Sequence, residues 1–497
     1  MSDTGDRPEG VAQNPAPADL LVHSADLLAT CDSQRREIAD GWVAITDGMI
    51  SAVGGSSEAP PPATLRIDAR GCLVTPGLIN THHHMYQNLT RSYAPALRGG
   101  LFDWLTTLYP LWARLDEQGA YLSAWVGLAE LALGGCTTST DHLYVHPRGA
   151  GDLIAAEIRA ATELGMRFHP TRGSMSLGQS GGGLPPDEAC QTREEILEDS
   201  ERLVATHHDR SPDAMVRIAL APCSPFSVST DLMTATAEMA ERLDVRLHTH
   251  LCEDPGEDGF CVEMFGMRPV EYFEHCGWGT SRSWIAHGVQ PNPSEIARLG
   301  RWGTGVAHCP SSNLLLGVGL APVRELRAAG VPVGLGVDGS SSTDSASMWT
   351  EARNALLVGR LRDGQRNLSV EKGLDSGRPA ADANRDGPEQ DSTVYFSARD
   401  VLDAATRGSA GCLGREGEIG ELTPGACGDL VVWQLDGPAF AGALSDPIEA
   451  WLRCGPLSAR ETIVAGQPIV TDGRIVHPAL DERLAAHRLS AAAMQRA

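Results

Sequence analysis

Residues 76–85 read PGLINTHHHM, a short apolar run that ends in three consecutive histidines. Side chains alternate faces along an extended chain, so His82 and His84 are expected to point one way and His83 the other. Two imidazoles on one face of a strand can bind one metal ion, whereas a polar surface turn is the alternative for a single motif of this kind. The stretch therefore predicts part of a metal site, whose other ligands must come from elsewhere in the chain.

Seven more short apolar or β-branched runs end in polar residues, and helical patterns with apolar residues three to four positions apart separate them. In chain order the runs read CTTSTDH, MRFHPTRG, VRIALAPCSP, DVRLHTH, SWIAHG, TGVAHCP and VPVGLGVDG. Eight strand–helix units in series predict an α/β fold, a (β/α)8 TIM barrel, with a doubly wound open sheet as the alternative.

The flanks of these units have a different pattern. Residues 19–73 and 415–480 alternate like β-strands, and each segment is too short of strands to form a domain alone. We therefore expect both segments to join in one small β-sandwich beside a barrel formed by residues 74–414. The acidic, Pro-rich residues 1–18 are expected to be a disordered tail, and the Gly/Asp/Pro-rich residues 365–392 a flexible loop.

Composition excludes several classes of partner. The net charge of -24 disfavours a nucleic-acid surface and docking on anionic membranes. No run of about 18 apolar residues is present to span a membrane, and the N-terminus lacks the basic and apolar regions of a signal peptide. The twelve cysteines are scattered without a CxxC motif, which favours reduced thiols. We therefore expect a cytoplasmic protein that binds a small molecule.

Functional side chains of a TIM barrel lie at the C-terminal ends of its strands. Beyond the first run, such ends carry His248 and His250 followed by Glu253, then His287, His308 and Asp338. A single histidine at a strand end is usually a hydrogen-bonded structural residue, but scatter of 16 histidines does not place so many at one rim. Imidazoles with a carboxylate suit Zn²⁺, with Fe²⁺ as the alternative, and leave one position open for water.

The stretches PGLINTHHHMYQNLTR, HTHLCED, IAHG, VAHCPSSN and GLGVDGSSSTDS resemble, in sequence and in order, the amidohydrolase superfamily, specifically its cytosine, guanine and triazine deaminase branch. The resemblance implies one divalent ion held by His82, His84, His250 and Asp338. It also implies that Glu253 carries protons to the substrate ring, and that His287 and Asp338 orient the attacking water. His83 and His248 are left to support the ligands or to pack.

The chain contains a single lysine, Lys372, and the fourth run offers neither Lys nor Glu. Binuclear relatives bridge two metals with a carboxylated Lys at the end of that strand. The resemblance therefore implies a mononuclear site, and it favours ring deamination over hydrolysis of a cyclic amide.

Within the branch, the stretches LFDWLTTLYPLWARL, HPTRGSMSLGQSGGGLPPD and CPSSN most resemble the 8-oxoguanine deaminases, which implies conversion of 8-oxoguanine to urate. Hydroxytriazine aminohydrolases share much of this pattern, and guanine or isocytosine deamination also stays open. Gln87 and Arg172 follow the first and third runs and could read ring oxo groups and nitrogens, with a rim salt bridge as the alternative for Arg172. Trp104, Tyr109 and Trp112 fall near one helical face and could stack on a flat ring or simply pack.

Two rival functions are disfavoured. The sequence GLGVDG matches the dinucleotide-binding pattern G-x-G-x-x-G, but its glycines lie inside an apolar run and no helix follows. A non-catalytic scaffold would have lost metal ligands, which this chain retains. We therefore expect a deaminase that acts on a free heterocyclic base and assembles as a homodimer.

Overall fold

The computed structural model describes residues 17–371 and 396–496. Eight parallel strands close a barrel in which each strand pairs with the next one along the chain and the last pairs with the first. They are β6 (Leu78–Asn80), β8 (Cys136–Leu143), β9 (Arg167–Ser174), β10 (Ala219–Pro222), β11 (Arg246–Leu251), β12 (Ser283–His287), β13 (Gly305–His308) and β14 (Val333–Leu335). The predicted TIM barrel is confirmed, and the open sheet is wrong.

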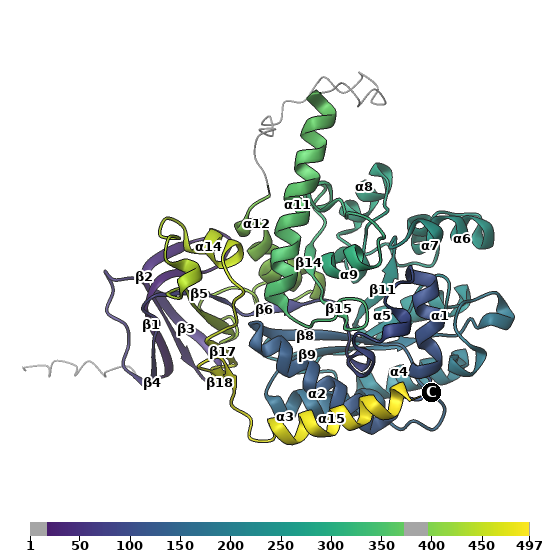
Figure 1. Cartoon of the computed structure of the whole chain (residues 1–497), viewed down its shortest axis with the longest axis horizontal. Coiled ribbons are helices and arrows are strands. Elements are labelled where there is room, and N and C mark those ends of the chain that lie inside the picture. The colour runs from purple at the N-terminus through teal and green to yellow at the C-terminus, as the bar shows by residue number, and fades with distance from the viewer. Residues whose placement is uncertain (1–16, 372–395, 497) are drawn as a thin grey trace, which may run out of the picture.

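Helices follow the strands and cover the outside of the barrel (Figure 1). They are α2 (Glu117–Leu133), α3 (Leu153–Leu164), α4 (Arg193–His207), α5 (Thr230–Leu243), α6 (Pro255–Phe265), α7 (Pro269–His275), α8 (Pro293–Trp302), α9 (Pro310–Leu315), α10 (Val323–Ala328) and α11 (Met348–Glu371). Local sequence sets their ends: Asp152 accepts the Ala155 N–H to cap α3, and Gly165 ends that helix in a left-handed conformation. In the described part of the chain, no helix combines the length and apolarity needed to cross a membrane.

The remaining helical elements lie between these strands and helices and within the C-terminal segment. The α-helices are α1 (Leu101–Trp112), α12 (Ala398–Asp403), α13 (Ser409–Leu413) and α14 (Pro447–Arg453). The 3-10 and π segments are η1 (Met85–Thr90), η2 (Ala94–Ala96), η3 (Gln179–Gly181), η4 (Asp187–Ala189), η5 (Ala404–Gly408) and η6 (Pro438–Phe440).

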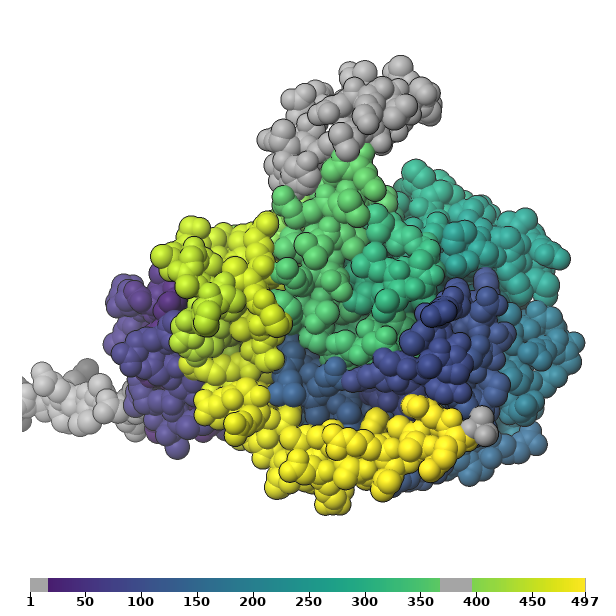
Figure 2. Space-filling model, viewed as in Figure 1, coloured from purple at the N-terminus to yellow at the C-terminus, as the bar shows by residue number. Residues whose placement is uncertain are grey.

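Strands from both ends of the chain form one nine-stranded sheet beside the barrel. They are β1 (Ala18–Ala29), β2 (Glu37–Thr46), β3 (Met49–Gly54), β4 (Ala63–Asp68), β5 (Cys72–Pro76), β16 (Leu430–Gln434), β17 (Glu461–Val464), β18 (Gln467–Thr471) and β19 (Arg474–Ile475). β5 and β16 pair antiparallel, with Leu73 opposite Trp433. One buried core joins Leu20 and Val43 to Ile463, so each segment completes the other, as predicted. Figure 2 shows the C-terminal segment lying between the N-terminal strands and the barrel.

The C-terminus adds an element that the sequence pattern did not predict. Helix α15 (Leu480–Gln495) leaves the sheet and runs along the outside of the barrel beneath α2 (Figures 1 and 2). Its Gln495 amide donates to the Leu89 carbonyl of η1, so the end of the chain is tied to the segment that follows the triple histidine.

Two further predictions concern the segments expected to lack structure. The predicted tail lies outside the described residues up to residue 16, and β1 already begins at Ala18. The predicted loop over 365–392 needs correction at its start, because α11 continues to Glu371. The sequence QRNLSVE over 365–371 contains neither Gly nor Pro to end the helix there. The rest of that loop, with Lys372, lies outside the described residues.

The run GLGVDG forms the closing strand of the barrel rather than a phosphate-binding turn. A Cβ atom on Gly336 would lie 2.7 Å from the Cβ atom of His82, so glycine is needed there to let the last strand approach the first. The residues after Gly339 form turns, and α11 begins only at Met348. The structure therefore gives no support to dinucleotide binding by this run.

Candidate metal centre and active site

The closing seam of the barrel brings the first candidate ligands together. Beyond β6 and β14 the chain continues as β7 (His83–His84) and β15 (Asp338–Gly339), which pair in parallel with Asp338 opposite His83. The Asp338 N–H also donates to the His82 carbonyl at 3.0 Å. β11 directs His250 to the same end of the barrel, with its ring centroid 4.9 Å from that of His82.

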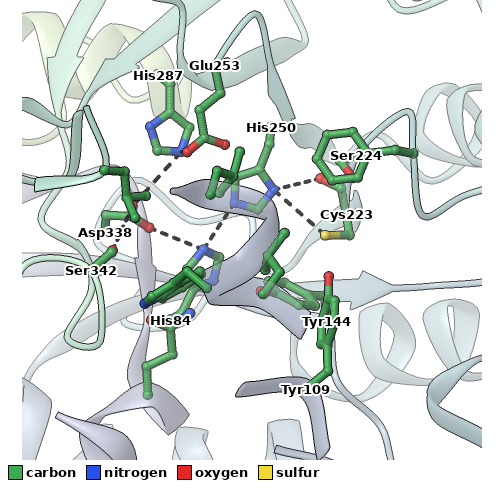
Figure 3. A pocket seen from close by; sticks show the side chains of 16 residues that line it. His84, Tyr109, Tyr144, Cys223, Ser224, His250, Glu253, His287, Asp338 and Ser342 are labelled. Carbon is green, nitrogen blue, oxygen red and sulfur yellow. Dashed lines mark hydrogen bonds and ion pairs between the residues drawn. The ribbon is translucent and has the colours of Figure 1, made fainter. Parts of the chain in front are cut away.

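The four predicted ligands converge on one point, and Figure 3 shows three of them, His84, His250 and Asp338. His84 Nε2 lies 3.0 Å from His250 Nε2 and 3.3 Å from Asp338 Oδ1, and His82 Nε2 lies 3.2 Å from the same Asp338 oxygen. Metal–ligand bonds of about 2.0–2.1 Å in a tetrahedron place neighbouring ligand atoms roughly 3.3 Å apart. All four side chains are buried. The spacing therefore fits a single ion of the size of Zn²⁺.

The proton positions on His84 and His250 favour metal binding. His84 Nδ1 lies 2.7 Å from the His142 carbonyl, and His250 Nδ1 lies 2.7 Å from the Cys223 carbonyl. Because a carbonyl only accepts hydrogen bonds, each Nδ1 must carry the proton. Each Nε2 of a neutral ring is then left with its lone pair facing the other ligands.

A longer chain of hydrogen bonds orients His82. His248 Nδ1 donates to the Trp284 carbonyl at 3.0 Å, so His248 Nε2 accepts from His82 Nδ1 at 2.8 Å. His82 Nε2 is buried and finds no hydrogen-bond partner among the described residues, as expected of a nitrogen whose partner is a cation. His248 thus supports a ligand from behind, in line with one of the two roles left open for it.

Electrostatics keep this set in the protonation states that a metal requires. Burial lowers the pKa of His82 well below its usual value and that of His250 to about 3, so both rings are neutral near pH 7. Burial alone would raise the pKa of Asp338, but the adjacent rings of His82, His84 and His287 hold it well below its usual range. Asp338 is therefore anionic, and the cluster combines neutral imidazoles with one negative charge.

Glu253 and His287 lie beside this cluster and can exchange protons with a bound molecule. Glu253 Oε1 is 3.5 Å from His287 Nε2, which lies 4.0 Å from Asp338 Oδ2. Burial and the nearby Asp338 charge raise the pKa of Glu253 well above its usual value, so its carboxyl holds a proton near neutral pH. The other ring nitrogen of His287 lies 3.0 Å from the side-chain oxygen of Asn313.

The backbone turns sharply where these side chains leave the strands. Cys252, His287 and Asp338 adopt left-handed conformations, with φ of 56°, 73° and 59°. Residues other than glycine take such conformations at a cost of about 1–2 kcal/mol each, and strain of this kind is concentrated at functional sites. His287 and Asp338 line one pocket together with Glu253, the residue that follows the turn at Cys252.

Gln87 lies in the pocket, and its role in substrate binding stays a prediction. It lies in η1, and its Oε1 accepts the Ser341 N–H at 3.3 Å. Its Nε2 is buried without an acceptor in the described structure, and Gln87 lines the same pocket as His84 and Glu253. The side chain therefore offers an unused amide donor to a bound molecule.

The three aromatic residues of α1 have different roles. Trp104 and Tyr109 line the pocket, whereas Trp112 lies behind them and donates from Nε1 to Thr90 Oγ1 at 3.0 Å. The Tyr109 hydroxyl is buried, has no partner within the described residues and points toward the cavity in Figure 3. Stacking on a substrate ring is thus open to Trp104 and Tyr109, while Trp112 packs.

Arg172 does not reach the pocket, which corrects the prediction that it binds substrate. Its Nε donates to Asp199 Oδ2 at 2.6 Å, its NH2 group to Gln191 Oε1 at 2.9 Å and its NH1 group to the Gly173 carbonyl. The guanidinium is fully enclosed by these acceptors. The rim salt bridge, which the sequence left open, is the observed arrangement.

Two residues near the cluster were not assigned from the sequence. The His142 ring stacks on that of His250 at 4.8 Å, and His142 lies among the groups able to hold a metal. Its position at the end of the run CTTSTDH was the available signal. Asn313, which orients His287, ends the motif CPSSN.

Behind the cluster, two buried carboxyls anchor the residue after the triple histidine. Asp141 of β8 accepts the Met85 N–H at 2.6 Å, and the buried carboxyl of Glu157 on α3 lies close enough to influence its pKa. Burial raises the pKa of Asp141 to about 7, and burial with the Asp141 charge raises the pKa of Glu157 well above its usual value. Asp141 Oδ2 and both Glu157 oxygens have no hydrogen-bond partner in the described structure, so we infer that the pair retains one proton between its two carboxyls near neutral pH.

This shared proton predicts a pH dependence of stability. The folded state retains a proton that the unfolded chain releases above about pH 4, so the free energy of unfolding falls as pH rises from about 4 through 7. In Glu157→Gln the amide donates to Asp141 without needing that proton. We expect the melting temperature of the variant, relative to that of the wild type, to increase between pH 5 and pH 8. Each unit by which folding raises the pKa in the wild type corresponds to about 1.4 kcal/mol in the free energy of unfolding. The exposed Glu198→Gln is the control and should show no such trend.

With this geometry established, comparisons with known proteins are informative. The model of the amidohydrolase family matches residues 73–467. The 8-oxoguanine deaminase of Pseudomonas aeruginosa is 46% identical over 92% of this chain and 95% of its own length. The hydroxydechloroatrazine ethylaminohydrolase of Pseudomonas sp. strain ADP is 36% identical over 84% of this chain and 81% of its own.

The fold is also similar to solved structures. The crystal structure of an atrazine chlorohydrolase from Arthrobacter aurescens TC1 in complex with zinc superimposes with a TM-score of 0.86. The two sequences are 34% identical, and the match covers 95% of this chain and all of the other.

Proposed function

Because the chain belongs to the amidohydrolase family, we propose that this metal-dependent C–N hydrolase deaminates an amino-oxo purine, converting 8-oxoguanine and water to urate and ammonia. One observation carries the proposal: the buried Glu253 carboxyl, whose pKa is raised well above its usual value, lies beside the candidate metal ligands. The pocket that it lines also holds two hydrogen-bond donors without a partner in the described structure, the Gln87 amide and the Tyr109 hydroxyl. A relative with 46% identity that is an 8-oxoguanine deaminase supports the choice of base.

We assign the metal to His82, His84, His250 and Asp338, whose atoms have the spacing and lone pairs that the ion needs. When bound, a divalent ion polarises water so that it ionises near neutral pH. Asp338 Oδ2 and His287 Nε2 face each other across the open side of the cluster, so they orient the attacking water and accept its proton.

Glu253 supplies the protons for bond cleavage. 8-Oxoguanine in its lactam form carries hydrogen on every ring nitrogen except N3, which neighbours the carbon that bears the amine. The protonated Glu253 carboxyl can give its proton to N3 as water adds to that carbon. The proton that Asp338 and His287 accepted from water then passes through Glu253 to the amine, and the C–N bond breaks with release of ammonia. The proton left on the added hydroxyl returns to Glu253 as the carbon becomes the third oxo carbon of urate.

Two donors match the two oxo groups of this base. Tyr109 and Glu253 line one pocket, and burial together with nearby groups that include Glu253 raises the pKa of Tyr109 well above its usual value. The phenol therefore remains a donor. We assign the 8-oxo group to the Tyr109 hydroxyl and the 6-oxo group to the Gln87 amide, two pocket-lining donors without a partner in the described structure.

The choice between a purine and a triazine can be tested directly. We expect kcat/KM for 8-oxoguanine to exceed that for a hydroxytriazine bearing an alkylamine by at least about tenfold, which corresponds to about 1.4 kcal/mol. Ammonia or amine release is measured for both, with guanine and isocytosine alongside. The 36% identical hydroxydechloroatrazine ethylaminohydrolase makes the triazine the main alternative. A tenfold preference for the triazine would reject the purine but leave the metal site and Glu253 in place.

Removing the Tyr109 hydroxyl should act on one substrate group. In Tyr109→Phe the ring is kept and one neutral hydrogen bond of about 0.5–1.5 kcal/mol is lost. We expect kcat/KM for 8-oxoguanine to fall about 3- to 10-fold, mainly through KM. Guanine lacks the 8-oxo group, so its kinetics should change little. An equal loss for the two bases would mean that Tyr109 does not read the 8-oxo group.

A further inference from the structure

Glu257 contacts the backbone of Glu253, the residue proposed to transfer protons, but does not line the pocket. It belongs to the first turn of α6, and its side chain is buried. Its two carboxyl oxygens accept the backbone N–H groups of Cys252 and Glu253, each at 2.9 Å. One side chain thus fixes both peptide groups that lead into Glu253.

The peptide that Glu257 fixes is in a strained conformation. Cys252 has φ of 56°, a conformation that residues other than glycine keep only when their surroundings enforce it. The Cys252 carbonyl is held from the other side by the N–H groups of Val289 and Gln290, at 2.8 and 2.9 Å. These last two residues follow His287, so the same turn links the strand end of Glu253 to that of His287.

Capping of α6 does not explain the arrangement. Asp254 is the N-cap residue of that helix and accepts the Gly256 N–H at 2.7 Å. The carboxylate of Glu257 instead reaches back past the cap to residues outside the helix. Each of its two oxygens accepts one of two consecutive backbone N–H groups, those of Cys252 and Glu253. Two such bonds fix both the position and the orientation of the turn.

We propose that Glu257 is a positioning residue for Glu253: it holds the left-handed turn at Cys252 so that the Glu253 carboxyl stays beside His287 Nε2. This rests on the proposed function, in which Glu253 moves the protons. Release of the turn lets Cys252 relax toward an ordinary conformation, which redirects the side chain of the next residue away from the ring nitrogen that it protonates.

Glu257→Gln tests this role. Glutamine keeps the size of the side chain but offers one acceptor, and its amide hydrogens oppose the second backbone N–H. We expect kcat to fall about 10- to 100-fold, because misplacement of a catalytic group by about 1 Å has an effect of this size. KM and metal content should stay near wild type.

The double variant Glu253→Gln/Glu257→Gln shows whether the effect passes through Glu253. If it does, the double variant is no slower than Glu253→Gln alone. Glu295→Gln is the matched control, because Glu295 is also buried and accepts a backbone N–H, that of Asn292, at 2.7 Å in the capping box of α8. It should lower stability and leave kcat unchanged. A further tenfold loss in the double variant, or an unchanged kcat in Glu257→Gln, would overturn the proposal.

A crystal structure of metal-loaded Glu257→Gln decides the matter independently of turnover. Displacement of the Glu253 carboxyl from His287, with a changed φ at Cys252, supports the proposal, and an unmoved carboxyl refutes it. Failure of the wild-type enzyme to release ammonia from any purine would reject the proposed function alone, since this structural result does not depend on the substrate.

Discussion

Glu253→Gln is expected to lose turnover by about 100-fold or more while keeping its metal. Glutamine has nearly the same shape as glutamic acid, but it cannot give up and regain a proton. In the proposed reaction the ring nitrogen is protonated as water adds and the amine leaves as ammonia, so both steps depend on this carboxyl. Steady-state ammonia release gives kcat and KM, and elemental analysis gives the metal content of the same preparation.

The structure predicts where the loss should appear. Glu253 Oε1 is 3.5 Å from His287 Nε2, and Glu253 is not one of the four residues whose ligand atoms converge on the proposed metal position. Binding of metal and of substrate should therefore change little, and the loss should fall on kcat. A variant with nearly wild-type kcat would show that another group moves the protons. Glu198→Gln, exposed on α4, controls for the change of charge.

The fold and the convergence of the candidate metal ligands could be predicted because both depend on the regular geometry of a strand–helix barrel. Eight apolar runs separated by helical patterns leave few arrangements other than a closed barrel, and every strand of such a barrel ends at the same rim. Polar residues at the ends of those runs, such as His84, His250 and Asp338, therefore had to meet. The predicted family is confirmed by the match over residues 73–467.

Residues whose roles depend on the particular group that they contact in the folded chain were beyond prediction. Arg172 sits at a strand end like the true site residues, and only the folded chain shows that Asp199, from the next helix, captures its guanidinium. Glu257 is an ordinary acidic residue near a helix start until its bonds to the backbone of Cys252 and Glu253 are seen. Alternation and spacing give the direction of a side chain but not its partner.

Helix α15 was missed for a related reason. The alternating pattern typical of strands ends near residue 480. The helix that follows has few buried side chains, of which Met494 is one. Its attachment depends on contacts with α2 and η1, such as that of Gln495 with Leu89. A weakly amphipathic segment of this kind gives little signal until its docking surface is known.

Removing the metal is expected to abolish turnover, and one ion per chain should restore it. A bound divalent ion stabilises developing charge by several kcal/mol, so its loss should lower kcat at least about 10³-fold. Among the residues that the structure describes, two groups could hold a metal, and they share His82 and His250, so a second ion there would have to take ligands from the first. Titration of chelator-treated enzyme with Zn²⁺ should therefore reach full activity at one equivalent. Two ions per active chain would contradict the mononuclear site.

The triple histidine provides a matched pair of variants for the same question. His84 directs Nε2 to His250 and Asp338, whereas His83 lies on the other face of the strand, near Gly127 of α2. His84→Ala should lose most of its metal and its activity, because one of four ligands is gone. His83→Ala removes the buried imidazole of the preceding residue in the same strand, yet it should retain one ion per chain. Equal metal loss in the two variants, measured against a competing chelator, would mean that the site depends on the packing of this strand and not on His84 as a ligand.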